Sequence, residues 1–141
     1  MIVLDTNVVS EMMKRGKADR AVTAWLDHQI GETIWLTSIT IFEIRFGIEL
    51  LTRGQRRSRL EEEFARAIKE DFEERVLAFD RSAAEAAAGF VARRRAAGKP
   101  VEFRDAEIAG IVAAQGGTLA TRNGKDFQDF AIPLVNPWTD G

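Results

Sequence analysis

Four acidic residues stand where a charge needs a physical reason. Asp5 directly follows a short apolar run of the kind that forms a buried strand. Glu43 and Asp105 each interrupt an apolar stripe with helical spacing, and Asp126 follows another short apolar run. In an open α/β sheet, ligands bind just past the carboxyl ends of the strands. The pattern predicts that these carboxylates meet at that edge and form a site.

Asp105 and Glu43 are the most unusual of the four, because their helices should bury the faces that they occupy. The positions three, four, seven and eight after Asp105 are all apolar. Glu43 has Ile39 four residues before it and Phe46 three residues after it. Residues at these spacings share one helix face. Each carboxylate is therefore expected to point inward.

Inward carboxylates that lie close together repel one another. At ~4 Å and an effective dielectric of ~20, a like-charged pair costs about 4 kcal/mol, whereas a small domain is stable by only ~5–15 kcal/mol in total. Either the acids take up protons or a cation lies among them. The motifs contain oxygen donors and no histidine or cysteine, a set that favours Mg²⁺ or Mn²⁺ over zinc.

Each acid also has a purely structural interpretation. Asp5 and Asp105 are acceptable N-caps for the helices that follow them. Glu43 can extend its carboxylate to solvent or pair with Arg45 or Arg104. The pair with Arg45 is unfavourable, because residues two apart do not face each other on a helix. The fourth acid, taken alone, is an ordinary loop residue. The conjunction of all four favours a site.

The elements that must position these residues alternate along the chain. The apolar runs predict strands at 2–4, 33–36, 76–79, 118–120 and 134–135. The helical patterns predict helices at 8–14, 18–29, from a cap at Ser38 or Thr40 to about 51, 55–75, 81–97 and 105–115, with a polar loop at 121–125. Strands separated by helices pair in parallel. We therefore expect an α/β fold, in which residues 1–141 form a single domain.

Composition narrows the function classes. The chain of 141 residues has 45% hydrophobic and 30% charged residues and no cysteine, so we expect a soluble protein with its own core, and a reducing cytoplasm is allowed. The longest apolar-rich stretch contains Glu43, Arg45 and Glu49, so neither a membrane span nor a signal peptide is expected. The net charge of −2 leaves room only for a local basic patch that could bind nucleic acid.

Four segments resemble the successive motifs of the PIN-domain ribonucleases, and in particular those of the VapC-type toxins with their FitB-like members. The segments are 2–7 (IVLDTN), 38–44 (SITIFEI), 105–110 (DAEIAG) and 119–127 (LATRNGKDF). Their order and spacing are kept over nearly the whole chain. The resemblance implies a three-layer α/β/α fold with a central, mostly parallel sheet. It also implies an endoribonuclease site that depends on Mg²⁺ or Mn²⁺.

The same resemblance implies macromolecular partners. The family's toxins cut an RNA substrate and form homodimers, and a cognate VapB-type antitoxin blocks the site and carries the complex to operator DNA. We therefore expect RNA, an antitoxin and a second copy of the chain as partners. DNA is expected to be contacted only through the antitoxin. The protein is expected in the cytoplasm.

The resemblance also implies roles for the first three acids and their neighbours. Asp5, Glu43 and Asp105 match the family's central acidic metal ligands, and Thr6 and Asn7 match the residues that steady the first of them. In the mechanism that this implies, the acids hold an ion that activates a water and neutralises the charge developing on the scissile phosphate.

The last motif departs from the fullest acidic pattern of the family. Thr121 matches its hydroxyl residue, but Asn123 stands where some relatives place an aspartate, which leaves Asp126 as the remaining acid. Asn123 is interpreted as a neutral ligand or a water-positioning group. Asp126 is interpreted as a second-site ligand or a structural partner of the loop. The departure leaves a second metal site open and does not affect the first.

Two other classes of protein share part of the pattern. A phosphoacceptor receiver domain also gathers carboxylates at strand ends, but it needs an acidic pair after the first strand, where Asp5 stands alone. A catalytically weak PIN-fold binding module, which acts with an antitoxin on operator DNA, is the alternative to the enzyme. Metal-dependent cleavage distinguishes that module from the enzyme.

Surface contacts are less specific than the acidic pattern. Residues 93–95, Lys99 and Arg104 either form a basic rim for phosphate groups or complement a helix dipole and remain solvated. The helix that contains Glu43 has more apolar residues than one buried face needs, which predicts an interface with a second copy or an antitoxin. The apolar residues concerned are Ile41, Phe42, Ile44, Phe46 and Ile48.

Overall fold

The computed structural model describes residues 1–30 and 33–140, so Gly141, the last residue of the expected domain, lies outside the described residues. Its strands are β1 (Ile2–Leu4), β2 (Ile34–Thr37), β3 (Val76–Leu77), β4 (Thr118–Ala120) and β5 (Leu134–Val135). Its α-helices are α1 (Thr6–Met12), α2 (Arg20–Asp27), α3 (Ser38–Glu49), α4 (Gln55–Arg66), α5 (Arg81–Ala96), α6 (Phe103–Gln115) and α7 (Gly124–Phe127). The short helical segments η1 (Arg15–Lys17) and η3 (Ala67–Asp71) follow α1 and α4.

The strands form one parallel sheet in the order β3-β2-β1-β4-β5, with β1 in the centre. Leu4, the last residue of β1, pairs with Ala120, the last residue of β4. The backbone N–H of Asp5 then donates to the carbonyl oxygen of Ala120 at 2.9 Å. Asp5 and Thr121 therefore leave the sheet side by side at its carboxyl edge, where the sequence predicts the site.

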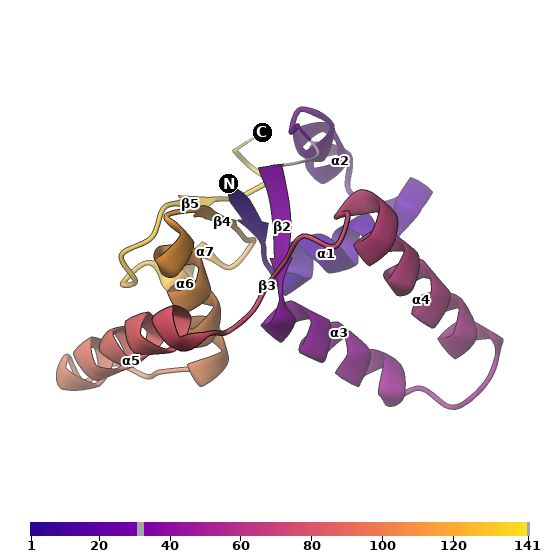
Figure 1. The fold of residues 1–141 in the computed structure, drawn as a ribbon. Coiled ribbons are helices and arrows are strands. Elements are labelled where there is room, and N and C mark those ends of the chain that lie inside the picture. Colours follow the sequence, from indigo (N-terminus) through magenta and orange to yellow (C-terminus); the bar gives the residue numbers. More distant parts are fainter. Residues whose placement is uncertain (31–32, 141) are drawn as a thin grey trace.

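Helices cover both faces of this sheet, which makes the fold three-layered (Figure 1). Successive residues of a strand point to opposite faces. Val3 packs in a core with α5 and α6, whereas Leu4 packs in a second core with α1, α2 and α4. Leu119 and Ala120 of β4 divide between the two cores in the same way. The predicted α/β/α class is confirmed. Within the described residues, no helix is long and apolar enough to cross a membrane.

Several predicted element boundaries differ from the structure, and three of the differences have a clear local reason. Thr37, rather than Ser38 or Thr40, caps α3, because its hydroxyl accepts the backbone N–H of Thr40 at 3.1 Å. The helix predicted at 55–75 has α-helical geometry only to residue 66 and then widens into η3. The predicted loop at 121–125 includes the start of α7. A helix of one turn is too short to produce a hydrophobic period that can be recognised in the sequence.

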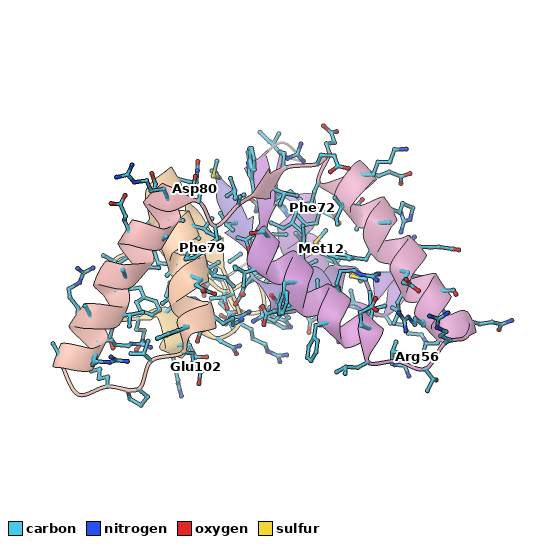
Figure 2. The ribbon with its side chains drawn as sticks, turned by 60° about the horizontal axis from the view of Figure 1, so that its bottom comes forward. Met12, Arg56, Phe72, Phe79, Asp80 and Glu102 are labelled. Atoms are coloured by element: carbon cyan, nitrogen blue, oxygen red, sulfur yellow. The ribbon has the colours of Figure 1, made fainter. Side chains whose placement is uncertain are left out.

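The backbones of α5 and α6 approach each other closely at Gly110. Figure 2 labels Asp80, whose side chain caps α5, and Glu102, which precedes α6. A Cβ atom at position 110 would lie 2.4 Å from the carbonyl oxygen of Ala83 and 2.9 Å from the Cβ of Ala87. Real Cβ atoms do not make such contacts, so this crossing requires glycine. Because α6 also carries Asp105, the crossing helps to position that carboxylate.

We predict that Gly110→Ala lowers the free energy of unfolding by about 1–3 kcal/mol, because overpacking forces two helices apart. Gly47→Ala is the matched control, since no atom lies within 4 Å of a Cβ at that position of α3. This control should raise the free energy of unfolding by up to ~1 kcal/mol through helix propensity. Urea unfolding followed by circular dichroism measures both effects. Equal stability of the two variants would contradict the packing argument.

Candidate active site at the carboxyl edge of the sheet

Asp5 is the most enclosed of the predicted acids, with no exposed surface. Its Oδ1 accepts the backbone N–H of Thr6 at 2.8 Å, so the carboxylate also caps α1. Its Oδ2 accepts the hydroxyl of Thr121 at 2.8 Å and, at 3.4 Å, the side-chain amide of Asn7. The capping interpretation is therefore correct. It does not exclude a site, because the same carboxylate also joins the acidic cluster described next.

Glu43 reaches the same point from α3. Its Oε1 accepts a 2.6 Å hydrogen bond from the hydroxyl of Thr6, and that hydroxyl lies 2.9 Å from the oxygen of Thr40. Thr40 is completely buried. The side chain of Thr6 therefore orients the second acid, whereas only its backbone N–H binds Asp5. Arg45, one of the two partners considered for Glu43, forms its ion pairs with other glutamates.

One guanidinium, that of Arg104, joins three of the predicted acids. Its Nε donates to Glu43 Oε2 at 2.8 Å, and its Nη2 donates to Asp5 Oδ1 at 2.8 Å. Its Nη1 donates to Asp105 Oδ1 at 2.5 Å. Each nitrogen thus holds a different carboxylate. Acids from the end of β1, from α3 and from the first turn of α6 converge on one cation, which we call the acidic cluster.

The charges of the acidic cluster act on one another strongly. Burial alone would lower the pKa of Arg104, but hydrogen bonding to Glu43 and the charge of Asp5 outweigh burial and raise it, so the guanidinium stays protonated. Burial raises the pKa of Asp105 above its usual range, and the hydrogen bond from Arg104 acts in the opposite direction. The negative charge of Asp126 raises the same pKa further.

The donor set of the acidic cluster suits a hard divalent ion chemically. Within residues 1–30 and 33–140, no three acidic, histidine or cysteine side chains are grouped closely enough to bind an ion together. The guanidinium of Arg104 lies among the three acids and holds each carboxylate on a separate nitrogen. Carboxylate oxygens are the preferred ligands of Mg²⁺ and Mn²⁺. The oxygen donors of the three acids therefore fit such an ion in chemical type.

The loop after β4 closes the site on one side. Thr121 is buried, and its oxygen accepts the backbone N–H of Asn123 at 3.0 Å while its hydroxyl donates to Asp5. Asn7 accepts the backbone N–H of Arg122 at 3.2 Å. These hydrogen bonds tie the loop to α1. The structure therefore brings Thr121 and Asn7 to the cluster, whereas Asn123 is exposed at its rim.

Asp126 stands apart from the acidic cluster. It lies on α7 and is exposed, and its backbone carbonyl accepts a hydrogen bond from Arg94 at 2.9 Å. Its charge reaches Asp105, as the pKa of Asp105 indicates. Among the contacts of the described residues, its carboxylate has no hydrogen bond or ion pair with Arg104. Asp126 is thus a neighbour of the cluster rather than one of its members.

Two residues of the site were missed or placed differently by sequence reasoning. The sequence predicts Arg104 only as a partner of Glu43 or as part of a basic rim, whereas the structure places it at the centre of the cluster. Its position directly before Asp105 was the available signal. Thr40 was considered only as a cap, but it lies three residues before Glu43 and so shares its helix face. Arg94 belongs to residues 93–95, for which the sequence allows a basic rim. Its guanidinium lies over the ring of Phe130, so the structure favours a packing role for this arginine.

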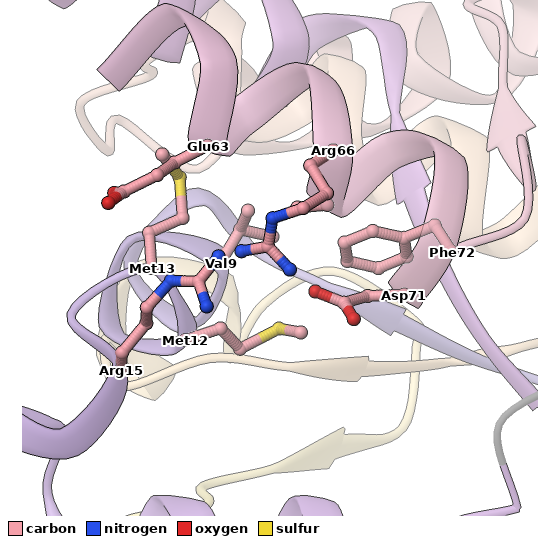
Figure 3. Close-up of a pocket in the computed structure, with 9 residues that line it drawn as sticks. Val9, Met12, Met13, Arg15, Glu63, Arg66, Asp71 and Phe72 are labelled. Atoms are coloured by element: carbon pink, nitrogen blue, oxygen red, sulfur yellow. The ribbon is translucent and has the colours of Figure 1, made fainter. Parts of the chain in front are cut away.

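A groove opens beside the acidic cluster between α1, α3 and α4. It has a volume of about 830 Å³, and Thr6 and Glu43 are among the residues that line it. Basic side chains line it as well: Lys14, Arg15, Lys17, Arg56 and Arg59. We call this hollow the basic groove. A smaller cavity of about 150 Å³, into which Arg15 and Arg66 point beside Asp71 (Figure 3), contains none of the predicted site residues.

Curated proteins with similar sequences span almost the whole chain. The plasmid stability protein StbB of Pseudomonas syringae pv. tomato is 42% identical over 98% of this chain and 99% of its own. The VapC ribonuclease Y4jK of Sinorhizobium fredii is 38% identical over 98% of each chain. The toxin FitB of Neisseria gonorrhoeae is 36% identical over 99% of this chain and 100% of its own.

Solved structures share the fold. FitAcB from Neisseria gonorrhoeae superposes with a TM-score of 0.89 at 35% identity and covers 99% of both chains. FitAB bound to an IR36 DNA fragment superposes with a TM-score of 0.88 at 36% identity, over 98% of this chain and 96% of the other. The model of the PIN domain family matches residues 2–133. The chain therefore belongs to the PIN-domain family of the VapC- and FitB-type toxins.

Proposed function

We propose that this protein is a metal-dependent endoribonuclease toxin, built as one PIN domain over residues 1–141, that hydrolyses RNA phosphodiester bonds. The observation that carries the proposal is the convergence of Asp5, Glu43 and Asp105 on a single cation. Membership of a nuclease family supports the reaction class, as does the relative whose name is VapC ribonuclease. A cluster of carboxylates kept only for stability would be costly compared with apolar packing.

In this proposal the three acids hold one Mg²⁺ or Mn²⁺ ion. When bound, such an ion supplies activation of a water nucleophile and neutralisation of charge on the scissile phosphate. The neighbouring hydroxyls hold the ligands in place: Thr121 binds Asp5 at 2.8 Å and Thr6 binds Glu43 at 2.6 Å. Asn7 supports both Asp5 and the loop after β4. Partners of this kind fix ligand orientation and usually matter nearly as much as the ligands.

The two polar residues at the rim have a different role. Asn123 and Asp126 are exposed next to the cluster, and we assign them to positioning water or substrate at the site rather than to holding the first ion. The charge of Asp126 already influences Asp105. Substrate phosphate would supply the further oxygen ligands that a second ion beside Asp126 needs.

The basic groove offers a path for the RNA backbone. Thr6 and Glu43 are among its lining residues, so an RNA strand that lies in the groove would pass beside the acidic cluster. Lysine and arginine side chains neutralise phosphates without reading sequence. This local patch explains how a chain with a net charge of −2 could bind nucleic acid.

We also propose a protein partner of the antitoxin type, with operator DNA bound only through that partner. The support comes from similar chains in solved complexes, among them FitAB bound to a DNA fragment. Three exposed apolar side chains, two on α3 and one at its C-cap, offer a surface for protein contacts. Phe42 is 70% exposed, Phe46 is 55% exposed and Leu50 is 70% exposed. The rings of Phe42 and Phe46 stack at 6.3 Å.

We predict that the purified protein cleaves RNA in Mg²⁺ or Mn²⁺ and not in EDTA. Asp5→Asn and Asp105→Asn should each reduce cleavage by about 100-fold or more, because loss of an outer-shell partner alone commonly costs 10–100-fold. Glu85→Gln is the matched control, since Glu85 lies on α5 in an exposed ion pair with Arg81. Cleavage of labelled total RNA, followed by fragment-end mapping, measures the effect. Folded protein without cleavage under any divalent ion would instead favour the non-catalytic binding module.

A second prediction concerns the buried hydroxyl of Thr121. Thr121→Val keeps the shape but removes the donor to Asp5, and we expect cleavage to fall by roughly 10–100-fold. Thr121→Ser keeps the hydroxyl and should retain most of the activity. Initial cleavage rates at saturating metal, with circular dichroism as the check on folding, compare the pair. Equal cleavage rates for the two variants would show that the hydroxyl of Thr121 has no role in the site.

A third prediction concerns the exposed face of α3. We expect the wild-type protein to be a homodimer and Phe42→Ser/Phe46→Ser to be a monomer with unchanged secondary structure, because a large exposed apolar patch marks a contact surface. Light scattering after size exclusion gives the mass of each. A double variant that remains a dimer would show that self-association does not use this face, and would leave it for an antitoxin.

A further inference from the structure

Arg104 occupies the position that the proposed function reserves for a metal ion. Its guanidinium contacts Asp5, Glu43 and Asp105, the same three carboxylates that would hold the ion. It belongs to α6 and directly precedes one of its own partners, Asp105. The cation at the centre of the cluster is therefore part of the chain itself.

The guanidinium uses the oxygen atoms that an ion would need. It binds Oδ1 of Asp5, Oε2 of Glu43 and Oδ1 of Asp105. The other oxygen of Asp5 accepts from Thr121, and the other oxygen of Glu43 accepts from Thr6. Oε2 of Glu43 and Oδ1 of Asp5, which also accepts the backbone N–H of Thr6, are thus the oxygens of these two acids that bind the cation. An ion and the guanidinium would compete for them.

Electrostatics allows the exchange. Three carboxylates with one guanidinium carry a formal charge of −2, so the cluster still attracts a divalent cation. The same carboxylates with a divalent ion in place of the guanidinium would carry −1. Like charges would therefore be better compensated after the exchange.

The surroundings of Arg104 also allow it to move. Its side chain is 31% exposed, whereas the side chain of Asp5 is 0% exposed and that of Asp105 is 9% exposed. A partly exposed arginine is able to turn into water without opening the core, and its charged head is readily solvated. Asp5 and Asp105, by contrast, are held by the fold, whereas Glu43, at 29% exposed, is about as open as Arg104 and is held by the hydroxyl of Thr6.

We propose that Arg104 is a competing occupant of the metal site: its guanidinium holds the three carboxylates in the metal-free protein, leaves when a divalent ion binds, and so sets the affinity for metal. The inference rests on the proposed function, because it concerns the same site. Arg104 acts through the ligands and is a positioning residue. It keeps the empty cluster folded at the expense of metal affinity.

Metal affinity gives the direct test, and it needs neither RNA nor activity. Isothermal titration with Mn²⁺ compares the wild-type protein with Arg104→Ala, Arg104→Lys and the control Arg81→Ala, whose side chain is 92% exposed on α5. We expect Arg104→Ala to bind Mn²⁺ at least about tenfold more tightly than wild type, which corresponds to about 1.4 kcal/mol. Arg104→Lys should lie between the two, because an ammonium keeps the charge but lacks the fork that binds three carboxylates. Arg81→Ala should match wild type.

Thermal unfolding gives an independent test, in which Arg104→Ala is expected to be less stable than wild type without metal although it binds metal more tightly. In EDTA, Arg104→Ala should melt below wild type, because three close carboxylates are left without a cation. Saturating Mn²⁺ should raise the melting temperature of Arg104→Ala more than that of wild type. A residue with a merely structural role would lower the melting temperature equally with and without metal, and that result would overturn the inference.

Side-chain NMR covers the case in which Arg104→Ala does not fold. In wild-type protein labelled with ¹⁵N-arginine, the Nε–H signal that is absent in Arg104→Lys belongs to Arg104. We expect Mg²⁺ to shift this signal towards the position of solvent-exposed arginines. An unchanged signal at a Mg²⁺ concentration that saturates the site would overturn the competition.

The outcomes also separate this inference from the proposed function. Wild-type protein that binds Mn²⁺ and cleaves RNA, together with unchanged affinity in Arg104→Ala, overturns the inference and leaves the nuclease standing. Absence of Mn²⁺ binding in both wild type and Arg104→Ala overturns both. Tighter binding in Arg104→Ala without RNA cleavage by any form of the protein supports the competition and counts against the nuclease.

Discussion

Three carboxylates that a fold brings to one point need a positive charge among them. At ~4 Å each like-charged pair costs about 4 kcal/mol at an effective dielectric of ~20, which is a large part of the stability of a small protein. Arg104 meets this need with one nitrogen for each acid. The proposed metal ion would meet the same need, so stability without metal and affinity for metal are linked through one residue.

The parallel sheet brings the acids together without requiring them to be close in sequence. β1 lies between β2 and β4, and all three strands end at the same edge. Asp5 and Thr121 follow two of these strands directly. Glu43 comes from α3, which begins immediately after β2, and Asp105 comes from the first turn of α6, the helix that leads into β4. Each acid thus depends on an element that begins or ends at this edge.

Small side chains and hydroxyls then set the fine geometry. Thr121 and Thr6 each hold one oxygen of an acid, and the other oxygen of that acid binds the guanidinium. Gly110 lets α6 approach α5 so closely that no side chain fits between them. The arrangement resembles an active site in which the ligands are positioned in advance and only the central cation changes.

The sequence by itself determined the fold class and the five strands. It also predicted four acidic positions at the sheet edge, of which three meet there. Period, strand length and buried charge made these predictions possible, because they are local features. The family resemblance rested on the same residues and is confirmed. Tertiary structure alone decided that Arg104 lies at the centre and Asp126 outside, since both are ordinary charged residues in the local pattern. It also decided that Thr6 orients Glu43, a contact across 37 residues. Such pairings depend on how separate elements pack, and no local propensity encodes them.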